Sequence, residues 1–194
     1  TIIPIGGRLL ILIVAAGATR AGRARNARGG LLDDRNGRGW RSVTANTTIA
    51  ACAALYAHDP GVRDLAALVV ASVLIAGAGD TVASEIGKAF GGRVAFSLIP
   101  VRRVPPGTPG AVSLVGTLAG IGSAVAMAVC AGGTGLVRIP DIAVVTIAAV
   151  VAILLDSLMA GVLEARGWLD NDGVNLLATC AAAIAATGLR GLWP

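Results

Sequence analysis

Long apolar stretches alternate along the chain with shorter polar connections, a pattern typical of membrane-spanning helices. A helix that crosses a bilayer needs about 20 mostly apolar residues. Six stretches approach that length. Five are residues 2–19, 43–57, 111–131, 142–163 and 174–192, and the other, third in chain order, begins at residue 64 and continues into the polar segment 79–88. The pattern therefore predicts an all-α, polytopic bundle of about six helices that forms a single transmembrane domain over residues 1–194.

The composition agrees with this prediction. Only 14% of the 194 residues are charged, against about 25% in soluble domains, and the mean hydropathy is +0.79. Cys52, Cys130 and Cys180 lie inside apolar runs without a CxxC pair, which favours a packing role. The first apolar run is interpreted as a retained helix and not as a signal peptide, because its basic cluster follows the run.

The basic residues indicate how the chain is oriented. Twelve of the 16 lie in or beside the three longer connections, residues 20–42, 91–110 and 165–173, and seven of them are arginines between Arg20 and Arg41. Alternating helices place all three connections on one side, which the positive-inside rule makes cytoplasmic, with the N-terminus outside. A multi-pass cell-membrane protein explains the arginines, so no nucleic-acid partner is expected.

The segment 79–88 follows a charge-free run and carries a stripe of polar side chains. Residues 65–79 carry no charge, and at about 100° per residue the polar side chains that follow share one side of a helix. The opposite arc is apolar and suits packing or lipid. The stripe consists of Asp80, Thr81, Ser84, Glu85 and Lys88.

A second aspartate suggests a shared site. Asp156, followed by Ser157, interrupts the fifth stretch as Asp80 and Thr81 interrupt the third. A charge at membrane depth costs about 2.5–3.5 kcal/mol on insertion scales, so paired aspartates at similar depth indicate a function. Carboxylates brought together need a countercharge, and Mg²⁺ prefers hard oxygen ligands and substrate phosphates. We expect the metal ligands to be Asp80, Glu85 and Asp156, and whether Glu85 or the more interfacial Glu164 completes the set stays open.

Polar residues in the connections extend the candidate site. Prolines and glycines between Arg103 and residue 111 predict a rigid turn before the fourth helix, and a helix N-terminus there favours phosphate. Arginine pairs can clamp phosphate oxygens in a forked geometry. Asparagines enter the second and sixth helices and face the two aspartates in the predicted bundle. The expected substrate- or nucleotide-binding residues are Asn46, Thr81, Ser84, Lys88, Arg102, Arg103, Gly107, Thr108, Ser157, Asn171 and Asn175.

These residues lie in four segments that together resemble one family. The segments read RGWRSVTAN (38–46), GDTVASEIG (79–87), VPPGTPGAVSLVG (104–116) and, over 155–175, LDSLMAG through LDNDGVN. They are similar, in this order, to the integral membrane family that includes chloroplast phytyl-phosphate kinase. Residues 79–91 more distantly resemble CTP-dependent lipid kinases and phosphatidate cytidylyltransferases. Val82 and Ser42 stand where the family often has an aromatic residue and glutamine.

The resemblance implies phosphoryl transfer from a nucleoside triphosphate, with CTP as the expected donor, to an isoprenyl or polyprenyl monophosphate lipid, and Mg²⁺ is the expected metal ion. Because the acceptor is already an anion, this chemistry needs positioning and charge neutralisation and no general base. Two alternatives stay open from the residues alone. One is a cytidylyltransferase that makes a CDP-lipid, and the other is a small ion-coupled transporter, for which midplane charges are typical. The sequence predicts nothing about the oligomeric state.

Overall fold

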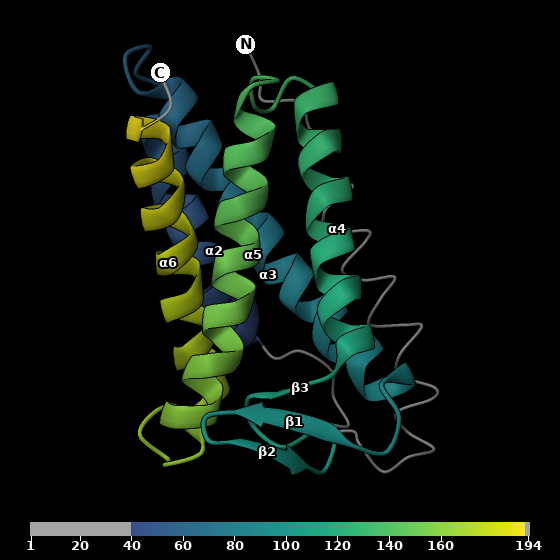
Figure 1. Cartoon of the computed structure of the whole chain (residues 1–194). Helices are drawn as coiled ribbons and strands as arrows, with labels where there is room; N and C mark the ends of the chain where they lie inside the picture. The colour runs from purple at the N-terminus through teal and green to yellow at the C-terminus, as the bar shows by residue number, and fades with distance from the viewer. Residues whose placement is uncertain (1–39, 193–194) are drawn as a thin grey trace.

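The computed structural model describes residues 40–192 and leaves out residues 1–39 and 193–194. In the described part, α-helices pack side by side and a small sheet lies across one end of the bundle (Figure 1). The expected helix over residues 2–19 lies outside the described residues. The helices are α2 (Trp40–Tyr56), α3 (Arg63–Phe90), α4 (Leu114–Gly133), α5 (Asp141–Met159) and α6 (Asn171–Leu192).

Four helices of the described part are long and apolar enough to cross a membrane: α3, α4, α5 with the turn that follows it to Glu164, and α6. They correspond to the third to sixth apolar stretches. The second stretch also forms a helix, α2, but its 17 residues are fewer than the roughly 20 that span a bilayer.

Helix α3 forms the centre of the bundle. It packs against each of α2, α4, α5 and α6, and 78% of its most apolar 18-residue window is buried, against 33% in α4 and α6. Its charge-free run, residues 65–79, supplies fully covered side chains such as Leu68, Val73 and Ile75. The polar stripe continues on the same helix without a break, so the core positions the polar residues that follow it.

Glycines allow α3 and α4 to approach each other at backbone distance. A Cβ at Gly116 would lie 2.5 Å from the Ala83 carbonyl oxygen and 2.8 Å from the Gly87 Cα. A Cβ at Gly120 would lie 2.8 Å from the Cβ of Ala83. Small residues drive close packing of this kind in membranes, where apolar side chains gain little from leaving lipid.

We predict that Gly116→Ala destabilises the protein by about 2 kcal/mol, because backbone atoms of α3 block the added methyl group and the helices must separate. Gly122, on the same helix, has nothing within 4 Å of an added Cβ and provides the matched control. Gly122→Ala should be neutral or slightly stabilising. Thermal unfolding in detergent micelles measures both, and equal midpoints for the two variants would contradict the close crossing.

The segment between α3 and α4 corrects the all-α prediction. It contains β1 (Ala95–Leu98), β2 (Val101–Val104) and β3 (Ala111–Val112), antiparallel in the order β2-β1-β3. The peptide bond before Pro100, between β1 and β2, is cis. Helix α4 therefore begins at Leu114 and not at residue 111, with the Ser113 hydroxyl accepting a hydrogen bond from the Gly116 N–H at 3.1 Å. Residue 111 belongs to a strand because its backbone pairs with β1.

A turn forms at the place predicted before α4. The N–H and hydroxyl of Thr108 both donate to the Pro105 carbonyl, at 3.3 and 2.8 Å. Gly107 has φ +88°, the left-handed conformation that the third position of a type II turn requires. Gly110, with φ +69°, is so close to α5 that an added Cβ would lie 2.5 Å from the Ser157 carbonyl oxygen.

The end of α5 also differs from the regular helix predicted to residue 163. After Met159 the chain continues as a π-helical turn, η1 (Ala160–Glu164). Such turns are rare and frequently lie at functional sites. Here the turn begins three residues after Ser157 and lies beside the Gly110 turn.

Candidate active site between four helices

A small pocket of about 200 Å³, including its opening, lies among α2, α3, α5 and α6. Asp80 is ten residues before the end of α3 and Asn175 is four residues into α6, which places the pocket about 6–15 Å inside the helix ends nearest the sheet. Its lining residues are Asn46, Ala76, Gly77, Asp80, Ala152, Ile153, Asp156, Asn175, Ala178 and Thr179.

The amide of Asn46 is oriented by its own helix. Its Nδ2 donates to the Ser42 carbonyl at 2.9 Å, which leaves Oδ1 as an acceptor that points toward α3. A Cβ at Gly77 would lie 2.8 Å from this Oδ1. The absence of a side chain at Gly77 thus makes room for the amide beside Asp80, one helical turn further along α3.

Two further polar side chains of the pocket are almost fully buried: Asp156 is 8% exposed and Asn175 is 5% exposed. A buried carboxylate is costly unless charge or hydrogen bonds compensate it. Thr179 donates to the Leu176 carbonyl at 2.8 Å and lies 3.4 Å from the Ala45 carbonyl oxygen, which ties α6 to α2 beside the pocket. The pocket therefore presents carboxylate and amide oxygens in an apolar surround.

The structure brings four of the sequence-predicted residues together: Asn46, Asp80, Asp156 and Asn175, each from a different helix. Glu85 and Lys88 are half-buried further along α3 and do not line the pocket. Within residues 40–192, no three carboxylate, imidazole or thiol groups lie close enough to hold a metal ion. A metal ion here would have two aspartates as its charged protein ligands.

Several predicted hydroxyls are engaged by backbone and not by the pocket. The Thr81 hydroxyl donates to the Gly77 carbonyl at 2.7 Å, and that of Ser84 donates to the Thr81 carbonyl at 3.2 Å. The Ser157 hydroxyl donates weakly to the Ile153 carbonyl at 3.5 Å. Hydroxyls commonly satisfy themselves in this way inside membrane helices.

The connection residues lie at the sheet end, outside the pocket lining. Gly107 and Thr108 build the turn before β3, and Asn171 is the exposed first residue of α6. Arg102 and Arg103 are both exposed on β2. Because successive strand residues point to opposite faces, the two guanidinium groups do not share a side of the sheet.

Sequence reasoning missed Thr179 and Gly77 among the residues that line the pocket. Helical spacing was the available signal. Thr179 is four residues after Asn175, and Gly77 is three residues before Asp80, so each pair shares a helix face.

Near the pocket, an ion pair joins the starts of α2 and α6. An Arg41 Nη donates to an Asp170 carboxylate oxygen at 2.7 Å, and the other Asp170 oxygen accepts from the Gly173 N–H at 2.9 Å. The Gly173 hydrogen bond and then the Arg41 charge hold the pKa of Asp170 below its usual range. Asp170 thus caps α6 and holds it beside α2.

Because the folded-state pKa of Asp170 is lowered, its ionisation stabilises the fold above the unfolded-state pKa of about 3.9. That contribution is lost as the pH falls through the lower folded-state pKa. Asp170→Asn keeps a capping side chain without the charge, so its melting temperature should lie slightly below wild type at neutral pH, and the difference should shrink as the pH falls through the lowered folded-state pKa of Asp170. A difference that stays constant with pH would contradict this.

These features define a class: a multi-span helical membrane protein with a buried acidic pocket. Residues 6–183 match the family described as Integral membrane protein DUF92, so the chain belongs to this family of integral membrane proteins. The resemblance to the family that includes chloroplast phytyl-phosphate kinase is confirmed.

Two relatives are similar over nearly the whole chain. An uncharacterized membrane protein of Synechocystis sp., sll0875, is 36% identical over 192 residues, which is 95% of this chain and 74% of the relative. The chloroplastic protein VTE6 of Arabidopsis thaliana is 31% identical over 182 residues, which is 90% of this chain and 54% of the relative. The chain thus spans about half the length of the plant protein. No solved structure matches this chain.

Proposed function

We propose that the pocket between α2, α3, α5 and α6 transfers a phosphoryl group from a nucleoside triphosphate, with CTP as the preferred donor, to an isoprenyl or polyprenyl monophosphate. The observation that carries the proposal is the convergence of Asp80, Asp156, Asn46 and Asn175 from four helices on one buried pocket. Membership of a family that includes phytyl-phosphate kinase supports an isoprenoid phosphate as the acceptor.

The ligand chemistry of the pocket suits Mg²⁺. This ion is usually held by one or two carboxylates, with waters and substrate phosphate oxygens completing the octahedron. Asp80 and Asp156 would supply the carboxylates, and Asn46 Oδ1, oriented by the Ser42 carbonyl, would supply an amide oxygen. When bound, the metal ion neutralises the charge of the reacting phosphates. Glu85 does not line the pocket and is left out of this proposed ligand set.

The chain's own residues would position two anions against each other. An oxygen of the acceptor monophosphate attacks the γ-phosphorus, and the bond from that phosphorus to the β–γ bridging oxygen breaks, which releases the nucleoside diphosphate. No proton has to leave the nucleophile. Lys88 and Arg102 would bind phosphate oxygens near the sheet, while the lipid tail lies along the apolar helices. We place this end of the bundle in the cytoplasm on the positive-inside rule.

The test is to incubate the purified protein in lipid nanodiscs with Mg²⁺, each of CTP, ATP, GTP and UTP, and phytyl, farnesyl or geranylgeranyl monophosphate. The proposal predicts an isoprenyl diphosphate and a nucleoside diphosphate in equal amounts. A CDP-lipid with released pyrophosphate would identify the cytidylyltransferase instead. The absence of either product with every donor and acceptor would overturn the enzyme proposal.

A further inference from the structure

One face of the sheet combines exposed apolar side chains with an arginine. Directly opposed residues of antiparallel strands share a face, and the pairs are Phe96 with Arg103 and Leu98 with Val101. Phe96 is 44% exposed and Val101 is 80% exposed. We refer to Phe96, Leu98, Val101 and Arg103 as the outer face of the sheet.

The other face is packed along β1. Ala95 and Ser97 are only 5% and 6% exposed on it. Arg102, which pairs with Ser97, belongs to this face. Two adjacent arginines of β2 therefore differ in their surroundings, and only Arg103 stands among exposed apolar side chains.

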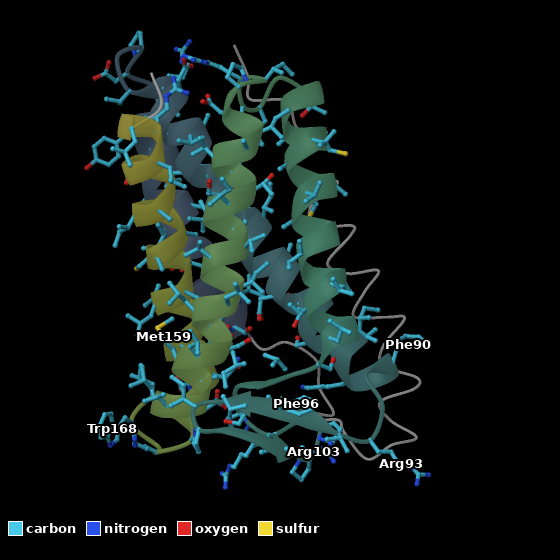
Figure 2. The ribbon with its side chains drawn as sticks, in the orientation of Figure 1. Phe90, Arg93, Phe96, Arg103, Met159 and Trp168 are labelled. Atoms are coloured by element: carbon cyan, nitrogen blue, oxygen red, sulfur yellow. The ribbon has the colours of Figure 1, made fainter. Side chains whose placement is uncertain are left out.

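The sheet stays close to the ends of the membrane-spanning helices. Four residues separate Phe90 of α3 from β1, and Ser113 alone separates β3 from α4, so the sheet lies within about 15 Å of both helix ends. Trp40 and Trp168 at this end are 78% and 68% exposed, as is typical of the aromatic belt at a membrane interface. Figure 2 shows Trp168, Phe96, Arg103 and Arg93 gathered at this end of the bundle.

We propose that the outer face of the sheet lies in the headgroup region of the bilayer and binds anionic lipid headgroups. Residues 91–112 contain three arginines and no acidic residue, and a guanidinium group forms strong forked hydrogen bonds with a lipid phosphate. The exposed Phe96, Val101 and, at the hairpin tip, the 52% exposed Ile99 reach the acyl boundary. This proposal does not depend on the pocket's function.

The charge of the segment before α2 argues against this segment as the binding partner of the outer face. Residues 20–39 carry six arginines and two aspartates, so this segment would be repelled by the arginines beside the outer face. Free phosphate would satisfy the guanidinium groups but not the exposed apolar side chains. An anionic lipid surface complements both.

The test uses the full chain with Cys52, Cys130 and Cys180 replaced by alanine and a bimane label at Val101→Cys, in nanodiscs of phosphatidylcholine with or without phosphatidylglycerol. We expect spin-labelled lipids to quench the bimane, and phosphatidylglycerol carrying the spin label to quench it more than phosphatidylcholine. Arg103→Gln should lower this preference by about fivefold, the effect of one cation near an anionic surface. Arg102→Gln, the matched control on the opposite face, should change it less.

Two results would overturn the proposal. The first is a label that neutral acrylamide in water quenches fully and lipid does not. The second is equal quenching by the two spin-labelled lipids. Val101 is 80% exposed, so a label there should leave the fold intact.

Discussion

Asp80→Asn and Asp156→Asn are each expected to lower the rate of phosphoryl transfer by about 10²- to 10³-fold. Both aspartates line the pocket, and each substitution removes a negative charge from a site that has to hold a cation between phosphates. Asparagine keeps the shape of the side chain. Initial rates of diphosphate formation at saturating donor and acceptor measure the effect.

The controls separate loss of chemistry from loss of fold. Asp59, in the exposed connection between α2 and α3 at the far end of the bundle, should tolerate asparagine with an unchanged rate. Asp156 is buried, so the melting temperature of each variant is measured beside its rate, and rates are compared only at temperatures where the variant stays folded. Glu85→Gln should cost much less than either aspartate substitution. Full activity in Asp80→Asn would contradict the assignment.

Asp141→Ala is expected to destabilise the fold by about 3 kcal/mol. The Asp141 side chain is 5% exposed at the start of α5, where it accepts a hydrogen bond from Arg190 of α6 and lies 3.6 Å from Arg138 Nε. Removing the carboxylate leaves Arg190, whose side chain is only 24% exposed, without this partner in a poorly solvated place. Loss of folded protein with heat or added denaturing detergent measures the change.

The neighbouring ion pair supplies the matched control. Asp64, whose side chain is 66% exposed, lies 3.9 Å from the same Arg138, and an exposed pair contributes less than about 1 kcal/mol. Asp64→Ala should therefore shift the melting temperature little. Replacing Asp141 and Arg190 together by leucine should recover much of the lost stability, because no buried charge then lacks a partner. Equal shifts for Asp64→Ala and Asp141→Ala would contradict the importance of burial.

The helices were predictable because apolar length is a strong signal, but the sheet was not. Its strands have two to four residues and are separated by glycines and prolines. Strands this short show too little alternation of polar and apolar residues to be distinguished from a loop. This omission also led to the expectation of a joint arginine clamp. Once Arg102 and Arg103 lie on a strand, their side chains point to opposite faces.

The convergence of Asn46, Asp80, Asp156 and Asn175 was predictable because a polar residue inside an apolar helix points toward protein and not lipid. Their exact companions were not, since the contact between α2 and α6 at Ala45 and Thr179 depends on packing. Glu85 shows why polar residues on one helix do not all reach the same site. It lies about 140° around α3 from Asp80, and the pocket extends over only part of that arc.

Manganese binding measured by electron paramagnetic resonance tests the central claim most directly, because Mn²⁺ prefers the same oxygen ligands as Mg²⁺. With isoprenyl monophosphate present, the wild-type protein should bind one Mn²⁺ that excess Mg²⁺ displaces. Binding should be lost in both Asp80→Asn and Asp156→Asn but kept in Asp59→Asn. Undiminished binding in the two pocket variants would show that these aspartates do not form a metal site.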